Sequence, residues 1–454
     1  MNINPKIFKE YDIRGKYPQE LDEHTAFALG LAFAKVTKAK KIICGRDARL
    51  ESEKVFWPLL AGLNKGGVKV YDLGVCATPE LFFAVGEHDF PAGAMITASH
   101  SPAGETGVKF CDSRGRVFGL KTGLKKIKIQ VGKIKQQTMG KPQADFFSVT
   151  KEYRDFVLSL INPQILKGMN VVVDASGGSG ARLAETVFSF LPIKTTRMNF
   201  FSGDPYPDHG PNPLVKENQL PIVKEIKTAK ADLGIVFDGD ADRAIFIDEK
   251  GKFVEPYYLN CLLTELILAD KPKIRIVIDA RLGLGLAELI RARGSEALAH
   301  RAGYANIIKT MNQKKILFGC ENSGHFMFNY RLFGRKKNYV WGDAILPILL
   351  ILSYLKSNKL TLSQAIAKYS SAYAISGEKN YKVKDFDRLA KKFRQEFKGA
   401  EFSVLDGLSI KDRGERWYLN IRPSHTEPLA RLNVEARSRE VLAELLLKTE
   451  KLIK

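Results

Sequence analysis

Three aspartates alternate within six residues of this chain, Asp238-Gly239-Asp240-Ala241-Asp242-Arg243. The segments on either side, Leu233 to Phe237 and Ala244 to Ile247, are apolar and typical of strands. A loop between two strands would hold the three carboxylates close together, where they repel one another unless a cation lies among them. Hard oxygen ligands favour Mg²⁺ or Ca²⁺ over zinc, and an adjacent arginine suits a phosphate. The pattern therefore predicts a cation site beside a phosphate site.

Two other interpretations of the acidic loop are open. A calcium EF-hand also has acidic groups at positions 1, 3 and 5, and Glu249 would fall on its position 12. However, Arg243 stands where the EF-hand turn needs glycine, and the flanking segments indicate strands rather than helices. A solvated acidic turn is the second alternative, although such turns are rarely placed between two apolar runs.

A second loop carries a candidate nucleophile. Thr97-Ala98-Ser99-His100-Ser101-Pro102 is followed by Gly104, Gly107 and Lys109. A serine beside a histidine in a small, glycine-rich loop has the residue types of an activated nucleophile, and the hydroxyls and amides of the loop can hold a phosphate. A simple turn is the alternative for this loop taken alone.

A third loop offers groups for a sugar. In Gly319-Cys320-Glu321-Asn322-Ser323-Gly324-His325, Glu321 and Ser323 can hydrogen-bond sugar hydroxyls, and His325 can do the same or reach a phosphate. A buried histidine with a purely structural role explains the same residues when this loop is taken alone.

A fourth loop offers groups for a phosphate. Arg422-Pro423-Ser424-His425-Thr426-Glu427-Pro428 combines an arginine with two hydroxyl residues, which suits a phosphate cradle; an ordinary turn is the alternative. The segment Phe8 to Gly15 places Arg14 after an extended run, where it can bring a positive charge into a cleft.

Length and composition limit the classes of protein. The chain has 454 residues, which at about 150 residues per domain suggests two to four domains. We find no apolar run of the roughly 18 residues needed to span a membrane, and Ala344 to Leu352 contains Pro347 and predicts a buried helix. The five cysteines are scattered without metal-ligand spacing, and the N-terminus lacks a signal-peptide core, so we expect a cytoplasmic protein.

The formal net charge of +21 is compatible with a nucleic-acid partner. The Lys-rich stretch from Lys121 to Lys141 is the best candidate surface. Its apolar residues predict one buried face and one solvated lysine face: Leu124, Ile127, Ile129, Val131 and Ile134. Few aromatics are available there for base stacking. Nucleic-acid binding therefore stays a remote alternative.

The order of the segments predicts an α/β fold. A short β-branched run, a polar or glycine-rich turn and a helix-like stretch recur at Lys41 to Cys44, Val171 to Asp174 and Ile276 to Asp279, as in repeated βα units. The C-terminal part differs, because Trp417, Leu419 and Ile421 alternate with polar residues as in a half-buried strand. The same alternation recurs at Leu432, Val434 and Ala436, and a helix is expected from Glu440 to Ile453. We predict three similar α/β domains and a smaller α+β domain.

Together, and in this order, the motifs resemble those of the α-D-phosphohexomutase family, within it the phosphomannomutase/phosphoglucomutase group. The resemblance runs from Phe8 to Ala436. It implies three α/β domains with mixed sheets and a C-terminal α+β domain of the TATA-box-binding-protein-like type. We place domain I, with the phosphoserine loop, at 1–146, and domain II, with the metal loop, at 147–250. Domain III, with the sugar-binding loop, would span 251–370, and domain IV, with the phosphate-binding loop, 371–454.

The resemblance also implies a role for each motif. Ser99 would carry a phosphoryl group, and one of its phosphate oxygens would join Asp238, Asp240 and Asp242 around one Mg²⁺. The other catalytic residues implied are His100, Lys109, Arg14 and Arg243. The substrate-binding residues implied are Tyr11, Arg281, Tyr304, Glu321, Ser323, His325, Arg422, Ser424 and Thr426.

The activity implied is that of an isomerase-class phosphotransferase. It would interconvert hexose 1-phosphate and hexose 6-phosphate, of mannose, glucose or both, with hexose 1,6-bisphosphate as intermediate and activator. Sugar phosphates would be its only partners, with no nucleic acid and no membrane, in a monomer or weak homodimer. Tyr304 stands where the family often has histidine and Arg281 where this group often has lysine, so the preferred sugar is left open. A phosphoglucosamine mutase is the alternative, because the sugar-binding loop of such enzymes is similar to Glu321 to His325.

Overall fold

The computed structural model describes residues 3–135, 137–200, 209–424 and 428–454. Their Cα positions divide the chain into two compact units. The first unit comprises Met1–Phe253, Asn312–Lys315 and His325–Thr361. The second comprises Val254–Met311, Ile316–Gly324 and Leu362–Lys454. The chain thus leaves the first unit after Phe253 and enters it again twice, at Asn312–Lys315 and at His325–Thr361.

The N-terminal sheet of the first unit is mixed and has the strand order β1-β5-β4-β2-β3-β6. Its strands are β1 (Ile13–Lys16), β2 (Lys41–Arg46), β3 (Lys69–Val75), β4 (Ala92–Ile96), β5 (Glu105–Asp112) and β6 (Asp145–Phe146). The central pairings β2–β3 and β2–β4 are parallel, whereas β5 runs antiparallel to β4 and to β1. The strand predicted at Lys41 to Cys44 is confirmed as part of β2.

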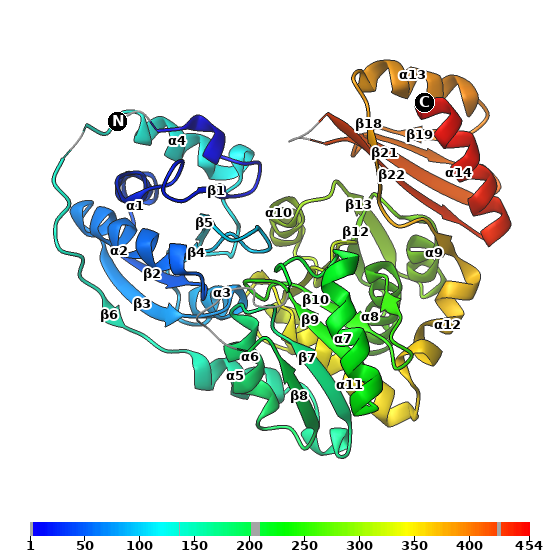
Figure 1. The fold of residues 1–454 in the computed structure, drawn as a ribbon, viewed down its shortest axis with the longest axis horizontal. Helices are drawn as coiled ribbons and strands as arrows, with labels where there is room; N and C mark the ends of the chain where they lie inside the picture. Colours follow the sequence, from blue (N-terminus) through cyan, green and yellow to red (C-terminus); the bar gives the residue numbers. More distant parts are fainter. Residues whose placement is uncertain (1–2, 136, 201–208, 425–427) are drawn as a thin grey trace. The chain divides into compact units, whose positions relative to one another are not determined.

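Helices cover both faces of this sheet (Figure 1). They are α1 (Glu23–Thr37), α2 (Leu50–Lys65), α3 (Thr78–Glu87) and α4 (Lys125–Val131). Because side chains alternate along a strand, Ile42 and Cys44 enter the core beneath α1 and α2. Gly45 faces the other way, where an added Cβ would lie 2.4 Å from Cys76 Sγ and 3.5 Å from Leu81 of α3. The carboxyl end of β2 is therefore clamped between two helical layers.

The lysine-rich segment behaves as predicted except at one position. Leu124, Ile127, Val131 and Ile134 are buried in the core of the N-terminal sheet. Ile129 is instead 50% exposed. The buried residues follow helical spacing of three and four, and Ile129 falls between them on the outer face. The expectation that Ile129 belongs to the buried face was wrong.

The second sheet of the first unit has the order β11-β10-β9-β7-β8. Its strands are β7 (Asn170–Asp174), β8 (Lys194–Met198), β9 (Leu233–Phe237), β10 (Ala244–Ile247) and β11 (Phe253–Val254). The helix α5 (Thr150–Leu158) precedes β7, and the helices α6 (Gly180–Phe188) and α7 (Lys216–Ala229) lie between its strands in the sequence. Antiparallel pairing of β9 with β10 places Phe237 opposite Ala244. The predicted strands on both sides of the acidic hexapeptide are confirmed, so the hexapeptide is a tight connection at one end of this pair.

The strands that follow are again mixed. In the second unit β12 (Arg275–Asp279) pairs in parallel with β13 (Glu296–His300) and with β14 (Phe318–Cys320). In the first unit β15 (Phe326–Asn329) pairs antiparallel with β16 (Val340–Gly342). The helices of this stretch are α8 (Pro256–Asp270), α9 (Leu284–Ala292), α10 (Tyr304–Lys314) and α11 (Ile345–Asn358). The predicted buried helix around Pro347 is confirmed as α11, whose residues Ile345 to Leu349 are all buried.

The C-terminal sheet has the order β17-β22-β21-β20-β19, with β18 also paired to β22. Its elements are β17 (Ala374–Ile375), β18 (Lys379–Lys382), β19 (Glu401–Ser403), β20 (Leu408–Lys411), β21 (Trp417–Pro423) and β22 (Leu429–Ala436), with helices α12 (Leu362–Ala372), α13 (Phe386–Glu396) and α14 (Arg439–Ile453). Leu419 and Ile421 of β21 lie in one core with Phe393 of α13 and Leu445 of α14. The predicted α+β arrangement of two alternating strands followed by a helix is confirmed.

A buried carboxylate ties the C-terminal sheet to α9 within the second unit. Glu435 of β22 accepts hydrogen bonds from the backbone N–H groups of Leu284 (2.9 Å) and Gly285 (2.6 Å) and from the hydroxyl of Tyr257. It thereby satisfies donors of the first turn of α9, which have no partner inside the helix. Burial raises the pKa of Glu435 above 4.5.

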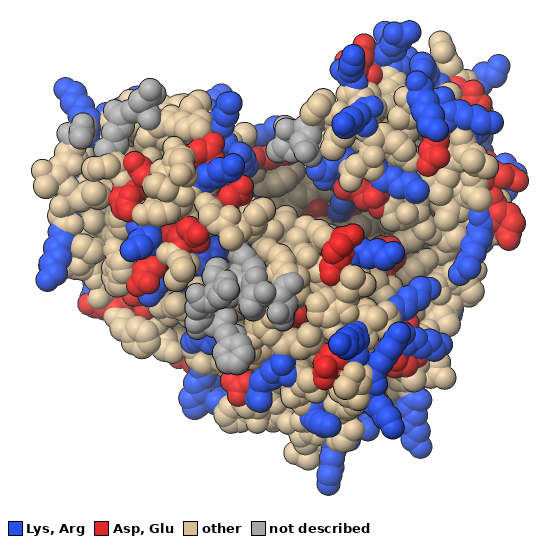
Figure 2. Space-filling view, viewed as in Figure 1, with Lys and Arg blue, Asp and Glu red and all other residues tan. Residues whose placement is uncertain are grey.

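Charged side chains are dispersed over the face of the molecule that Figure 2 shows. On the face shown in Figure 2, Lys and Arg side chains are scattered among Asp and Glu instead of gathering in a single stripe. Within the described residues, no single helix combines the length and apolar character that crossing a membrane requires. The pair α11 and α12, which is bent, meets that test by length and composition only when the two helices are taken together.

Candidate active site

The serine loop, residues 97–105, runs from the end of β4 to the start of β5 and holds Ser99 in a strained conformation. Ser99 has φ of 52°, in the left-handed region that costs energy for residues other than glycine. Its backbone N–H donates to Thr97 Oγ1 at 2.8 Å, and the residue is 3% exposed. The strained backbone therefore has a local support, and the loop presents Ser99 from a buried position.

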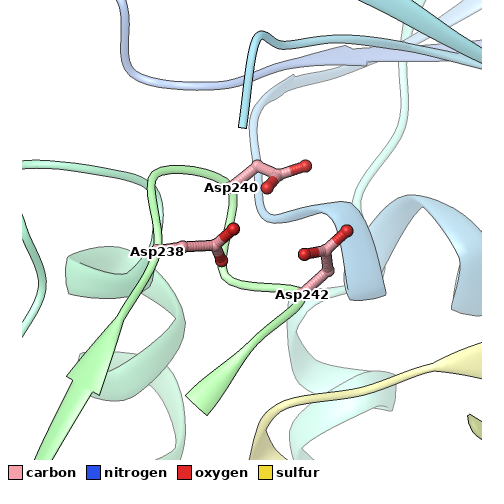
Figure 3. A group of neighbouring side chains, drawn as sticks. All are labelled: Asp238, Asp240 and Asp242. Carbon is pink, nitrogen blue, oxygen red and sulfur yellow. The ribbon is translucent and has the colours of Figure 1, made fainter. Parts of the chain in front are cut away.

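The acidic hexapeptide gathers its three carboxylates at one point, as predicted (Figure 3). One oxygen from each of Asp238, Asp240 and Asp242 lies within 4.8 Å of the others, and all three residues are buried. Ala241 takes a left-handed φ of 55° in this turn, and the N–H of Arg243 closes it by donating to Asp238 Oδ1 at 3.2 Å.

The serine loop and the acidic turn meet through Asp238. Ser99 Oγ donates to Asp238 Oδ2 at 2.9 Å, although the two residues are 139 positions apart. The guanidinium of Arg243 donates to the same oxygen at 2.9 Å and lies 3.5 Å from Ser99 Oγ. Two motifs that the sequence presented separately thus form one cluster of hydroxyl, carboxylates and guanidinium.

Lys109 joins this cluster from β5. Its Nζ lies 2.6 Å from both Asp240 Oδ2 and Asp242 Oδ2. Burial alone would lower the pKa of Lys109, but Asp240 and Asp242 outweigh it and raise the pKa above 10.5. The side chain is therefore an ammonium here and supplies a positive charge to the carboxylates.

His100 is the neutral member of the cluster. Its Nδ1 lies 3.1 Å from Ser99 Oγ. Burial, followed by the positive charges of Arg243 and Arg14, lowers the pKa of His100 well below 6.5. The Ser99 hydroxyl has one hydrogen, so the neutral imidazole can take up that proton only when the hydrogen turns from Asp238 to its Nδ1.

Two further predicted residues lie beside these groups. His325 Nε2 lies 3.3 Å from Asp242 Oδ1, so this side chain contacts the acidic turn. Glu321 and Ser323, of the same predicted loop, are part of the second unit. Arg14 donates to Asp12 at 2.8 Å and to Ser101 Oγ at 3.1 Å. The half-buried Tyr11 precedes it in the chain.

The ionisation of the aspartates shows how the site accommodates three negative charges. For Asp238, burial and the neighbouring Asp242 and Asp240 prevail over Arg243 and raise the pKa to about 6. For Asp242, burial is outweighed by Lys109 and then His325, so its pKa lies well below 3.8. Such divergence is expected of close carboxylates that share too little positive charge.

The same carboxylates fit a hard divalent cation. Their oxygens converge, and among the described residues the buried Asp240 Oδ1 makes no hydrogen bond. Carboxylate oxygens are the ligands that Mg²⁺ prefers, usually with several waters retained. The turn can therefore hold a metal ion with Asp238, Asp240 and Asp242 as ligands.

The second unit contains a second charged cluster, centred on Arg281. Its Nε donates to Asp279 Oδ2 at 2.7 Å, and its Nη2 lies 3.4 Å from Glu321 Oε1. Glu321 also accepts from the N–H of Gly303 at 3.0 Å, which fixes the carboxylate beside the half-buried Tyr304. The predicted residues Arg281 and Glu321 are thus neighbours, and Tyr304 follows Gly303 directly in the chain.

Glu378 connects Arg281 with the predicted phosphate-binding loop. It accepts from Arg422 Nη2 at 3.1 Å, from Arg431 Nη1 at 3.3 Å and from Arg281 Nη1 at 3.4 Å. Burial would raise the pKa of Glu378, but Arg281, then Arg422 and Arg431, outweigh it and lower the pKa below 4.5. A single carboxylate therefore lies among three guanidinium groups.

The remaining predicted residues are placed as follows. Ser323 is half-buried in the loop after β14, and Ser424 is half-buried at the end of β21. Arg431 Nη2 lies 3.5 Å from Ser424 Oγ. Thr426 lies outside the described residues.

Sequence reasoning missed Arg49 and Glu378. Arg49 is 4% exposed and donates to the carbonyl oxygen of Ser99 at 2.6 Å. A signal for it existed, because Asp47 and Arg49 follow a predicted buried strand, where α/β proteins gather functional groups. Glu378 follows Ser376 and Gly377 in a pattern that predicts no site.

Comparison with known proteins places the chain. Phosphoglucomutase/phosphomannomutase models match alpha/beta/alpha domain I at residues 5–138, domain II at 151–251 and domain III at 255–373. The model of the C-terminal domain matches residues 376–451. The chain belongs to the phosphoglucomutase/phosphomannomutase family. Three α/β domains with mixed sheets and a C-terminal α+β domain are thereby confirmed, while the boundaries expected at 146, 250 and 370 remain predictions.

Curated relatives agree with this family over nearly the whole chain. A protein from Xanthomonas campestris named phosphohexose mutases is 33% identical over 442 residues, covering 96% of this chain and 96% of its own length. A Vibrio cholerae phosphomannomutase is 31% identical over 444 residues, covering 95% of this chain and 94% of its own length. Mutases of this family are isomerase-class phosphotransferases, and so is this chain.

Solved structures share the fold. A phosphoglucomutase/phosphomannomutase family protein from Burkholderia thailandensis has a TM-score of 0.87 at 25% identity, covering 100% of this chain and 98% of its own. Aspergillus fumigatus N-acetylphosphoglucosamine mutase, in complex with GlcNAc-6P and magnesium, has a TM-score of 0.62 at 14% identity, covering 100% of this chain and 96% of its own. Another structure of the Aspergillus enzyme is a complex with glucose 1,6-bisphosphate.

Proposed function

We propose that this phosphohexomutase interconverts the 1- and 6-phosphates of mannose, glucose or both, through a phosphoserine at Ser99 and a hexose 1,6-bisphosphate. The observation that carries the proposal is the contact of Ser99 Oγ with Asp238, at 2.9 Å, beside Arg243. A serine hydroxyl needs neighbouring positive charge and a nearby base to exchange a phosphoryl group. Arg243 supplies the charge, and His100 supplies a neutral ring 3.1 Å from Ser99 Oγ.

The first half of the reaction transfers the phosphoryl group to the sugar. The bond from phosphorus to Ser99 Oγ breaks as the oxygen of the free sugar hydroxyl bonds to phosphorus. The sugar hydroxyl loses its proton, and Ser99 Oγ takes back the proton that His100 received in the preceding turnover, so that the Ser99 hydroxyl is restored. We keep Lys109 as the predicted carrier of this proton. Its ammonium is held by Asp240 and Asp242, so these contacts must open and the ammonium must release a proton before its amine can accept the proton of the sugar hydroxyl.

The second half returns the other phosphate to Ser99. The bisphosphate must turn over in the site so that its second phosphorus faces Ser99 Oγ. The Ser99 hydroxyl then attacks that phosphorus and gives its proton to His100, while the leaving sugar oxygen takes back the proton that Lys109 accepted in the first half. Either sugar end thus reacts at one serine, which yields the 1-phosphate or the 6-phosphate.

Asp238, Asp240 and Asp242 would hold one Mg²⁺, which neutralises charge that builds up on the transferred phosphoryl group. Two observations support this cofactor: the converging buried carboxylates of the chain and the magnesium in the Aspergillus mutase of the same fold. The glucose 1,6-bisphosphate complex of that mutase supports the bisphosphate as intermediate and activator.

Glu321 and Ser323 would hydrogen-bond the sugar hydroxyls, and Arg422, Ser424 and Thr426 would hold the phosphate that is not transferred. The guanidinium of Arg422 is of the type that binds a phosphate through two parallel hydrogen bonds.

The test is an assay of the purified protein with Mg²⁺, a trace of hexose 1,6-bisphosphate and the 1-phosphates of mannose, glucose and glucosamine, followed by ³¹P NMR. We expect turnover of the mannose and glucose substrates, loss of that turnover in Ser99→Ala, and a mass increase of one phosphate that the variant lacks. Ser189→Ala, at an exposed serine after α6, is the matched control. Full turnover by Ser99→Ala would reject the phosphoserine, and preference for glucosamine 1-phosphate would favour a phosphoglucosamine mutase.

A further inference from the structure

The buried guanidinium of Arg49 holds the serine loop by hydrogen bonds to its carbonyl oxygens. Arg49 Nη2 donates to the carbonyl oxygens of Ser99 at 2.6 Å and of Ser101 at 2.7 Å. Its Nη1 lies 3.1 Å from the carbonyl oxygen of Pro102 and 3.3 Å from that of Glu105. Four carbonyls of one loop therefore point at a single side chain.

The orientation of Arg49 is itself fixed. Its backbone N–H donates to Asp47 Oδ1 at 3.1 Å, and its Nε lies 3.3 Å from Asp47 Oδ2. Both side chains are almost fully buried, with exposures of 3% and 0%. Arg49 is also the residue that precedes α2. The guanidinium is thus anchored to the carboxyl end of β2 and the start of α2, which are rigid elements.

The carbonyl of Ser99 is also fixed from the side of the acidic turn. A Cβ on Gly239 would lie 2.3 Å from Ser99 O and 3.4 Å from Arg49 Nη2. The turn can approach the loop this closely because residue 239 has no side chain. The Ser99 peptide is therefore confined between the Arg49 guanidinium and the backbone of Gly239.

These contacts account for the strained φ of Ser99. A left-handed conformation at a residue other than glycine persists only when its surroundings over-determine it. The Ser99 carbonyl has the shortest of the four bonds to Arg49. The peptide orientation set by that bond decides in which direction Cβ, and hence Oγ, leaves the backbone.

We propose that Arg49 is a positioning residue for phosphoryl transfer, which sets the direction of Ser99 Oγ toward Asp238 through the carbonyl oxygens of the serine loop. The inference rests on the proposed role of Ser99. Arg49 would act without touching the substrate. Because Ser101 is held by the same Nη2, Arg49 also fixes the residue whose hydroxyl accepts from Arg14.

The first variant is Arg49→Lys, which keeps the positive charge. A single ammonium group cannot replace the planar guanidinium that donates to four carbonyl oxygens. We expect kcat to fall by roughly 100-fold, the cost of a misplacement of about 1 Å, with the KM for hexose 1-phosphate changed less than about threefold. Hydrogen exchange of the amides in residues 99–105 should accelerate, while exchange in α14 stays unchanged. The matched control is Arg46→Lys in β2, whose partners are Glu53 and Asp72 and whose kcat should stay within about twofold of wild type.

A second variant decides the matter if Arg49→Lys does not fold. Asp47→Asn replaces the carboxylate beside Arg49 Nε by a neutral amide. The guanidinium of Arg49 then keeps its charge but loses the ion pair that orients it. We expect kcat to fall severalfold with KM unchanged. A folded Arg49→Lys, or in its absence a folded Asp47→Asn, that keeps kcat within about twofold of wild type overturns the inference, and so does a loss carried by KM alone.

The same experiment separates this inference from the function on which it rests. Turnover in Ser99→Ala would reject the phosphoserine itself. An inactive Ser99→Ala together with a fully active Arg49→Lys would reject only the positioning role of Arg49.

Discussion

At the scale of residues, the site contains three buried carboxylates, and two cationic side chains offset only part of their negative charge. Asp238, Asp240 and Asp242 have Lys109 and Arg243 as cationic partners. The raised pKa of Asp238, about 6, results from burial and from the two neighbouring carboxylates. A divalent cation supplies the charge that this group of carboxylates lacks, which is the physical reason to expect Mg²⁺ here.

Removing one carboxylate tests this explanation. We expect Asp240→Asn to weaken binding of Mg²⁺ and of Mn²⁺ used as a probe, and to lower kcat by roughly 100-fold or more, because charge on the transferred phosphoryl group loses its stabilisation. Calorimetric titration of metal and kcat at saturating Mg²⁺ measure the two effects.

Asp248→Asn is the matched control for this variant. Asp248 is buried after β10 and accepts from the N–H groups of Lys250 and Lys252. Its replacement should reduce stability without changing metal affinity. Equal metal affinity in Asp240→Asn and wild type would contradict the assignment of Asp240 as a ligand.

At the scale of elements, two strands of the C-terminal sheet bring like charges together. Arg422 of β21 lies directly opposite Arg431 of β22, an arrangement that destabilises a sheet unless a partner offsets it. Glu378, immediately before β18, supplies that partner. Sheet register therefore concentrates positive charge where the substrate phosphate is proposed to bind.

Glu378→Gln should lower the free energy of unfolding at pH 7 by about 1–2 kcal/mol, more than an exposed ion pair and less than a fully buried one. The lowered pKa of Glu378 fixes the sign of the pH effect. Its contribution is fully present above the ordinary pKa of 4.5 and is lost as pH falls through the lowered folded-state value. Urea unfolding should therefore show a difference from wild type that is constant from pH 7 to about 5.5 and shrinks below pH 4.5.

Glu401→Gln, at an exposed position on β19, is the control for that series. A Glu378→Gln protein as stable as wild type at pH 7, or a difference that grows as the pH falls, would contradict the balancing role of Glu378.

At the scale of the whole molecule, the formal net charge of +21 would attract the proposed substrate, which carries a phosphate dianion. Long-range attraction raises the rate of encounter and is screened by salt, with a Debye length of about 10 Å at 0.1 M. Lys and Arg are spread over the face in Figure 2, and no single patch gathers them there.

We therefore expect kcat/KM for the hexose 1-phosphate to fall about tenfold between roughly 20 mM and 300 mM salt. Turnover at saturating substrate should change less than about twofold, because the encounter no longer limits it. Potassium acetate and potassium chloride should give the same result, which controls for specific anion binding. A kcat/KM independent of ionic strength would show that the net charge does not assist substrate capture.

The amino-acid sequence by itself determined the elements and the identity of the central groups. The apolar runs around the acidic hexapeptide, the recurring βα units and the alternation in β21 depend on neighbours a few residues away, so periodicity reveals them. Ser99 and the three aspartates could be singled out for the same reason, because their chemistry is visible within short motifs.

Only the tertiary structure decided which groups meet. Arg49 reaches the Ser99 carbonyl across 50 residues of chain, and Glu378 reaches Arg422 across 44. His325 lies against Asp242, whereas Glu321, four residues earlier, pairs with Arg281 in the other unit. Such contacts depend on strand order and register, which no local pattern specifies. The sequence therefore indicates the groups that we propose to react, and the fold brings together the residues that hold them in place.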